Sequence, residues 1–298
     1  MAALAPAEPI PARVATPPRR RTGRGRTSPL ATLGYVILAA LAAFCVIPFV
    51  WLILASVDPG ARPWLQLPAS IDLGNFFRFV TDPHFNRFLP NSLILAGGGT
   101  LVCTASAVLG GYALSRFRFR GRRALMFGIL LTRVIPTAAT IAPLYAIAQM
   151  LGLVNTHVGL ILIMAAQQLP LALWMLKGFF DTVPADLEEA AWIDGAGRLG
   201  SAIRIVLPLA GPGVAASALF TFIEAWGDFL TPFILLRDPD LYPISLGLFR
   251  AYVVHSLTDW GILTSVAVTY MIPGIIFYLI VRRFLLKATV VGALQGGA

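Results

Sequence analysis

The chain has 298 residues, of which 57% are hydrophobic and only 12% are charged. Soluble proteins of this size carry about 25% charged residues, so the composition predicts an integral membrane protein and argues against a soluble enzyme. The net charge of +9 lies in clusters that flank apolar runs, as the positive-inside rule expects, and this distribution argues against nucleic acid as a partner. Cys45 and Cys103 both lie inside apolar runs, so no disulfide framework is predicted.

The N-terminal residues 1–28 are rich in Ala, Pro and Arg and predict a disordered, basic, cytosolic tail. Its arginines are interpreted as an orientation signal near anionic lipid, with phosphate binding as the alternative. The apolar run at 30–57 is long enough for the ~20 residues of a membrane span and too long for a signal peptide. Residues 58–90 form an extracytoplasmic segment, in which 71–80 predict a short amphipathic helix.

A second span is predicted at residues 91–114, where Gly97 to Gly99 favour close helix packing in lipid. It ends in a cytosolic turn at 116–123 that contains five arginines. The third span, 124–150, contains Pro136 and Pro143 and is therefore predicted to be kinked or broken.

The fourth span is predicted at 158–180, the fifth at 212–236 and the sixth at 261–280. Together with the first three they form a permease domain at 29–284, followed by a cytosolic C-terminal tail at 285–298. Placing both termini in the cytosol puts every basic cluster on the cytosolic side.

The longest polar interruption of the second half is residues 183–211, here called the coupling segment. Pro184 suits a first helical turn, and the acids after it favour the positive end of a helix dipole. Gly195 can adopt the left-handed conformation that ends a helix, and Pro208 is expected to end the next one. The segment therefore predicts two short helices joined by a glycine turn, in a position that needs a cytosolic binding partner.

Within the coupling segment, Glu189, Ala190 and Ala191 are followed by Gly195, then by Ile205, Leu207 and Pro208. With these residues at this spacing, the segment resembles the EAA loop of ABC importer permeases. The extended pattern EAAxIDGA, which adds Asp194 and Ala196, resembles the carbohydrate-uptake branch, specifically the maltose-type second permease subunit. The resemblance covers residues 30–298. It implies an all-α integral membrane protein with the type I ABC importer permease fold, in which six transmembrane helices carry a cytosolic coupling-helix loop.

The same resemblance implies the partners. These are a second, maltose-type first-subunit permease in a heterodimer, two copies of a cytosolic ATPase subunit and an extracytoplasmic solute-binding protein, all at the lipid bilayer of a bacterial plasma membrane. The chain has no Walker A sequence, so ATP and Mg would be bound by the partner ATPase and no cofactor by this chain. The residues expected to contact the ATPase are Glu189, Ala190, Ala191, Asp194, Gly195, Ala196, Ile205, Leu207 and Pro208.

No catalytic or metal-binding residues are predicted, because the chain has no HExxH pattern and its three histidines are scattered. Glu224 and Asp228 are four residues apart and are expected to share one helix face. Because acids inside a span are expensive and often functional, they are predicted, with Trp226 and Gln167, to line the substrate path or the subunit interface. The expected cargo is a mono-, di- or oligosaccharide. The alternatives are import of a phosphorylated polyol such as glycerol 3-phosphate, and an ion-coupled secondary transporter with Glu224 or Asp228 as proton carrier.

Overall fold

The computed structural model describes residues 29–83, 85–254 and 259–295, and these residues form helices and connecting loops without a β-strand. The predicted N-terminal tail at 1–28 lies outside the described residues. The chain divides into two units, residues 1–48 and 49–298. Helix α1 (Pro29–Ser56) begins in the first unit, where residues 30–48 contain no charged side chain, and ends in the second.

By length and composition, four helices of the described residues can each cross a membrane: Ala31–Ser56, Phe88–Arg116, His157–Asp181 and Trp260–Phe284. Two bent pairs also pass this test, Arg122–Val134 with Thr137–Met150 and Arg198–Leu209 with Gly211–Gly227, which brings the total to 6 if each pair is one span. The predicted helical membrane protein is thus confirmed, with four to six candidate spans among the described residues.

A short helix, α2 (Gly74–Thr81), lies between the first two long helices, as predicted. The Asn75 amide donates hydrogen bonds of 3.2 Å to the carbonyl oxygens of Ser56 and Asp58, and so holds α2 against the end of α1. Trp51 meets Trp260 edge to face, with ring centroids 6.2 Å apart. These contacts hold α2 and the start of the last helix against the C-terminal end of α1.

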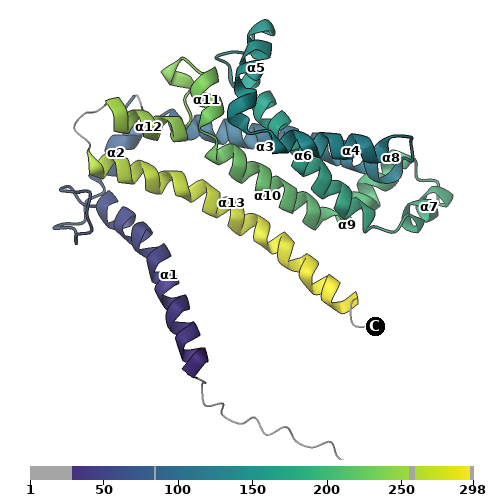
Figure 1. The fold of residues 1–298 in the computed structure, drawn as a ribbon, viewed down its shortest axis with the longest axis horizontal. Helices are drawn as coiled ribbons and strands as arrows, with labels where there is room; N and C mark the ends of the chain where they lie inside the picture. Colours follow the sequence, from purple (N-terminus) through teal and green to yellow (C-terminus); the bar gives the residue numbers. More distant parts are fainter. Residues whose placement is uncertain (1–28, 84, 255–258, 296–298) are drawn as a thin grey trace, which may run out of the picture. The chain divides into compact units, whose positions relative to one another are not determined.

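The centre of this unit is built from α3 (Phe88–Arg116) and α6 (His157–Asp181), with α10 (Gly211–Gly227) against both and α13 (Trp260–Gln295) against α10 (Figure 1). Gly111 explains how closely α3 approaches α6, because a Cβ atom there would lie only 3.1 Å from the backbone nitrogen of Lys177. The predicted close packing of the second span is confirmed. Helix α13 continues through position 285 to Gln295, so most of the expected C-terminal tail is helical.

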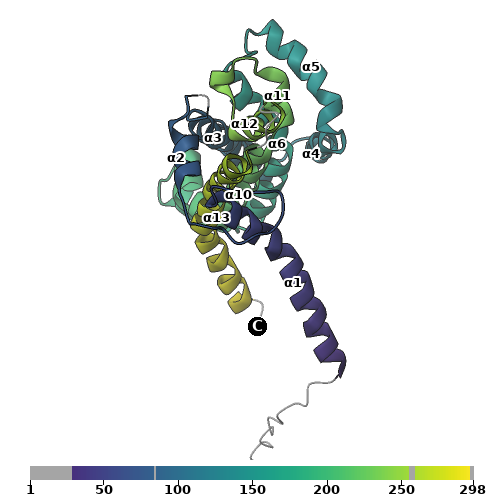
Figure 2. The same cartoon turned by 90° about the vertical axis from the view of Figure 1, so that its left-hand side faces the viewer.

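The third span breaks between α4 (Arg122–Leu131) and α5 (Thr137–Met150), which are joined by the 3-10 turn η1 (Thr132–Val134). The two arms are bent by 104°, and Figure 2 shows α5 leaving α4 at a steep angle. The break falls at Ile135, whose backbone is extended because a proline follows it. Pro143 lies inside α5 without ending it.

The fifth span differs from the prediction, because it is not one helix over 212–236. Helix α10 ends at Gly227, Asp228 is extended with φ −68° and ψ 119°, and a new helix, α11 (Leu230–Leu235), follows. Glycine weakens the helix at the break, and the Asp228 carboxylate accepts a hydrogen bond from the Thr231 backbone N–H at 3.1 Å, at the start of α11. Glu224 and Asp228 therefore do not share a helix face.

The remaining helices are short. The segment after α11 contains η3 (Pro239–Leu241) and α12 (Ile244–Val254). The coupling segment contains α7 (Asp186–Ile193), α8 (Arg198–Ser201), the π-helical turn η2 (Ala202–Val206) and α9 (Leu207–Leu209).

Candidate functional site

The coupling segment turns at Gly195, as predicted. Gly195 has φ +88°, its N–H donates to the Trp192 carbonyl at 3.1 Å, and the Ala196 N–H donates to the Ala191 carbonyl at 2.9 Å. These two bonds form a Schellman motif, which closes a helix C-terminus and requires a left-handed residue at the position of the glycine. The turn therefore sets the direction in which α8 leaves α7.

Side chains also join the two arms of the coupling segment. The Trp192 indole N–H donates to the Ser201 hydroxyl at 2.9 Å, and Ser201 is fully buried. The Arg198 guanidinium lies 5.2 Å from the centroid of the Trp192 ring, within the range of a cation–π contact. The arms are thus fixed to each other by backbone and by side-chain contacts.

The prediction that Pro208 ends the second arm is wrong. The helix passes through Pro208 to Leu209, and the chain then bends by 75° before α10. Proline has no N–H to donate to the Arg204 carbonyl, and the helix ladder widens just ahead of it into the π-helical turn Ala202–Val206. The connection to α10 is therefore irregular.

A buried ion pair ties the coupling segment to α3. Glu188 is 1% exposed, and its carboxylate accepts hydrogen bonds from Arg116 Nε and, at 2.7 Å, from the Tyr112 hydroxyl. Arg116 Nη2 also donates to the Val183 carbonyl at 3.0 Å. The sequence prediction selected Glu189 and missed this network. The sequence shows a second glutamate beside the motif, but it does not show that this glutamate pairs with Arg116.

The predicted coupling residues divide into an exposed and an inner group. Ala191 is buried within the chain, Ala196, Ile205 and Leu207 are half-buried, and the exposed members are Glu189, Ala190, Asp194, Gly195 and Pro208. Large apolar side chains lie exposed beside them, including Ile193 at 88% and Leu199. An exposed acidic and apolar surface on a stiff support is typical of a protein-binding site.

Two of the predicted path residues, Gln167 and Asp228, are connected through Thr231. The Thr231 hydroxyl lies 3.5 Å from Gln167 Oε1, and its backbone N–H donates to Asp228. Among the residues that the structure describes, the buried amide nitrogen of Gln167 has no hydrogen-bond partner. Thr231 is fully buried and was missed, because nothing in its local sequence distinguishes it.

Glu224 lies in a small hollow between α6 and α10 that it shares with Gln168, Ser217 and Thr221. Among the described residues, the buried Ser217 hydroxyl in this hollow has no hydrogen-bond partner, and neither do the buried hydroxyls of Thr100 and Thr104 on α3. Buried polar atoms are normally satisfied, so a substrate or water can complete them. Gln167, Gln168 and Glu224 are here called the polar seam. Gln168 was visible in the sequence as the neighbour of Gln167.

Trp226 is a packing residue in this conformation. Its indole N–H donates to the Tyr270 carbonyl at 3.0 Å, and its ring stacks on Phe222 and Tyr270 between α10 and α13. The structure therefore places Trp226 in the core between α10 and α13. Within the described ranges, no three His, Cys, Asp or Glu side chains gather closely enough to hold a metal ion.

Replacing Asp228 will separate its structural role from a role of its charge. Asp228→Ala removes the acceptor at the start of α11 and is expected to cost about 1 kcal/mol of stability, measured as a lower Tm of the purified protein. Asp228→Asn keeps an acceptor and is expected to restore the Tm. If Asp228→Asn nevertheless loses transport, the charge itself is required; equal Tm values for Ala and Asn would contradict the capping role.

Comparison with known proteins places these features in a family. Residues 106–290 match the family described as binding-protein-dependent transport system inner membrane component. The chain is 32% identical to the trehalose/maltose transport system permease protein MalG of Thermococcus litoralis over 90% of this chain and 96% of that protein. It is 30% identical to the diacetylchitobiose uptake system permease protein NgcG of Streptomyces coelicolor, over 85% of each.

A solved structure has the same fold. The chain superimposes with a TM-score of 0.76 on a chain of a bacterial ABC transporter involved in the import of the acidic polysaccharide alginate, covering 85% of this chain and 95% of that one at 24% identity. At this identity the likeness concerns the fold alone.

Proposed function

The chain belongs to the family of binding-protein-dependent transport system inner membrane components, and we propose that it is a permease subunit of an ATP-driven ABC importer for sugars. The family consists of multi-pass transport subunits without catalytic activity of their own. Sugar as the cargo is supported by relatives named for trehalose and maltose, for diacetylchitobiose and for maltodextrin. A mono-, di- or oligosaccharide fits this range.

The coupling segment is the observation that carries the proposal. It combines a stiff glycine turn, a buried ionic attachment to α3 and an exposed face with Glu189 and Ile193. We propose that a cytosolic ATPase subunit covers this face, with Glu189 accepting hydrogen bonds and the apolar side chains excluding water. The ATPase binds ATP and Mg, and this chain binds neither.

The attachment explains how movement of an ATPase would reach the spans. A partner shifts a conformational equilibrium only through different affinities for the two states. If the coupling segment moves as one body with α3, the ATPase's preference for one state also changes the position of α3 in the membrane. There the polar seam of Gln167, Gln168 and Glu224 would open to a sugar. Neutral and charged oxygen and nitrogen groups of this kind suit hydroxyl-rich ligands.

The proposed assembly has a second permease as heterodimer partner, two copies of the ATPase subunit and an extracytoplasmic solute-binding protein. Both chain termini are placed in the cytosol. This orientation is supported by the five arginines at 116–123, which lie at the same end of α3 as the coupling segment.

The decisive experiment is uptake by proteoliposomes that contain the full importer and its binding protein. We expect sugar uptake to require ATP in the compartment facing the coupling segment and to persist when the proton gradient is collapsed. Uptake that follows the proton gradient at constant ATP would identify a secondary transporter instead. Uptake of glycerol 3-phosphate without uptake of any sugar would reassign the cargo and leave the ABC mechanism standing.

Glu189→Ala is expected to lower binding-protein-stimulated ATP hydrolysis about tenfold or more, because a hydrogen bond to a charged group is worth about 1.5–3 kcal/mol. Asp186→Ala is the matched control, since Asp186 is also an exposed acid of the first turn of α7 but lies outside the motif. Equal losses in the two variants would show that Glu189 has no specific contact with the ATPase.

A further inference from the structure

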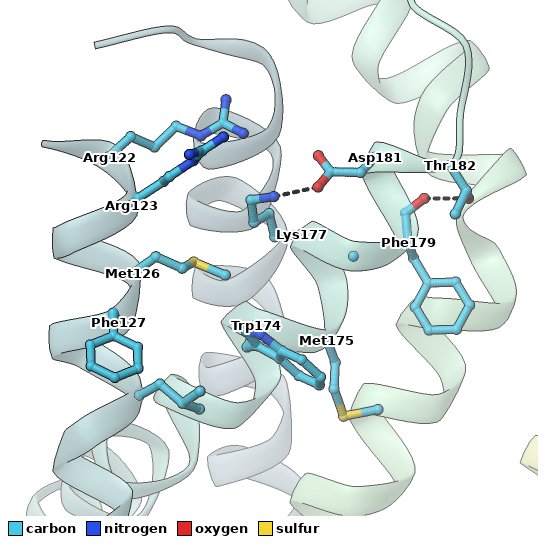
Figure 3. Close-up of a pocket in the computed structure, with 12 residues that line it drawn as sticks. Arg122, Arg123, Met126, Phe127, Trp174, Met175, Lys177, Phe179, Asp181 and Thr182 are labelled. Carbon is cyan, nitrogen blue, oxygen red and sulfur yellow. Dashed lines mark hydrogen bonds and ion pairs between the residues drawn. The ribbon is translucent and has the colours of Figure 1, made fainter. Parts of the chain in front are cut away.

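A groove of about 840 Å³ lies between α4 and α6 (Figure 3). Its walls are charged and polar in one part and apolar in the other. Charged and polar side chains line one part, namely Arg122, Arg123, Lys177, Asp181 and Thr182, and apolar side chains line the other, namely Met126, Phe127, Leu130, Trp174, Met175 and Phe179.

These two parts are separated along α4. On α4 the lining residues Arg122, Met126 and Leu130 follow one another at four-residue steps, so they form a line on one face. At 1.5 Å per residue this line extends about 12 Å from the guanidinium end to Leu130. On α6, Lys177 and Asp181 lie at the charged end and Trp174 one turn away from it, as Figure 3 shows.

The charged end carries an excess of positive charge. Lys177 is paired with Asp181, and Arg122 donates to the Ser115 carbonyl at 3.3 Å. Among the described residues, Arg123 pairs with no carboxylate. A second hollow continues from this end along Arg118, Arg122 and Arg123. The groove thus offers three cations against one carboxylate.

We propose that this groove binds one anionic phospholipid, with its headgroup phosphate on Arg122 and Arg123 and an acyl chain along Met126, Phe127 and Leu130. Basic pockets between transmembrane helices suit anionic headgroups, and a soluble anion would leave the apolar wall unfilled. Phe127 is 63% and Trp174 53% exposed within the chain, so the rings of both residues are accessible to an acyl chain. The inference rests on the proposed placement of these helices in the membrane and is independent of the cargo.

The test uses the full importer complex, purified in detergent and examined by native mass spectrometry after exchange into phosphatidylglycerol. The wild type is expected to retain one phosphatidylglycerol that the Arg122→Gln/Arg123→Gln variant loses. In a titration the variant's affinity is expected to fall on the order of thirtyfold, from the attraction that two basic side chains contribute near an anionic surface. Arg282→Gln/Arg283→Gln is the control, because these exposed arginines lie on α13 and do not line the groove.

Retention of the lipid by the variant, or equal retention of phosphatidylcholine, would overturn the proposal. So would displacement by millimolar inorganic phosphate, which would identify a free-anion site. A Phe127→Cys variant that crosslinks to the second permease, and not to a photoreactive phosphatidylglycerol, would show that a subunit fills the groove. ATP-dependent sugar uptake of the same preparation tests the proposed function separately.

Discussion

Arg116→Met is expected to abolish most ATP-driven transport and to destabilise the coupling segment by about 3–5 kcal/mol, because it leaves a buried carboxylate without its cation. Glu188 is almost fully buried, and its remaining partner would be the Tyr112 hydroxyl. The variant also loses the hydrogen bond from Arg116 to the Val183 carbonyl. Uptake by proteoliposomes and protease sensitivity of residues 183–211 would measure the two effects.

Two further variants make this result specific. Arg120→Met removes an exposed arginine of the same basic cluster that lines neither the groove nor the second hollow, and it is expected to leave transport nearly unchanged. Arg116→Met/Glu188→Gln removes both charges while keeping an acceptor for Tyr112, and it is expected to recover much of the lost stability, since the penalty comes from the unpaired charge. If the double variant is no better than Arg116→Met, the ion pair does not hold the coupling segment.

Gly195→Leu is expected to leave the complex assembled while lowering sugar transported per ATP hydrolysed by about five- to thirtyfold. A Cβ at Gly195 would meet no atom within 4 Å, so space does not limit the substitution. The cost arises from φ +88°, where a side chain adds about 1–2 kcal/mol, and relief of this strain redirects α8 relative to α7. Transport and binding-protein-stimulated ATP hydrolysis, measured on the same proteoliposomes, would show the uncoupling.

Gly195→Asn is the matched control, because asparagine tolerates the left-handed conformation better than other residues with a side chain. It is expected to retain most coupling. Full coupling in Gly195→Leu would contradict a rigid turn, and failure of the leucine variant to co-purify with the ATPase would assign Gly195 to the docking contact itself.

Most of the helical framework could be predicted because its signals are local. Apolar runs of sufficient length gave the long helices, and Pro136 marked the break of the third span. Gly195 lies at the end of a short helix with acids in its first turn, a pattern that predicts a C-terminal cap whatever surrounds it. These features depend on neighbours in the sequence and need no knowledge of packing.

The features that were missed depend on contacts between distant residues. Nothing near Glu188 in the sequence indicates that it pairs with Arg116, 72 positions earlier. The prediction therefore assigned a function to the neighbouring Glu189 alone. The break at Asp228 was hidden in an apolar run, where hydropathy alone favours one continuous helix. Trp226 was predicted to line the substrate path because its stacking partner, Tyr270, lies 44 positions later on another helix, and the sequence does not show this contact.

The π-helical turn and the 75° bend near Pro208 give the two ends of the coupling segment unequal stiffness. The end next to α6 is clamped to α3 by Arg116, whereas the end next to α10 contains a widened helix ladder and a proline. If a bound partner turns the exposed face, we therefore expect α3 and α6 to turn with it. On the α10 side, we expect the helix to bend between Ala202 and Ala210. The segment is thus firmly attached at its α6 end and has a weakened helix at its α10 end, so we expect α10 to follow its movement less closely than α3 does.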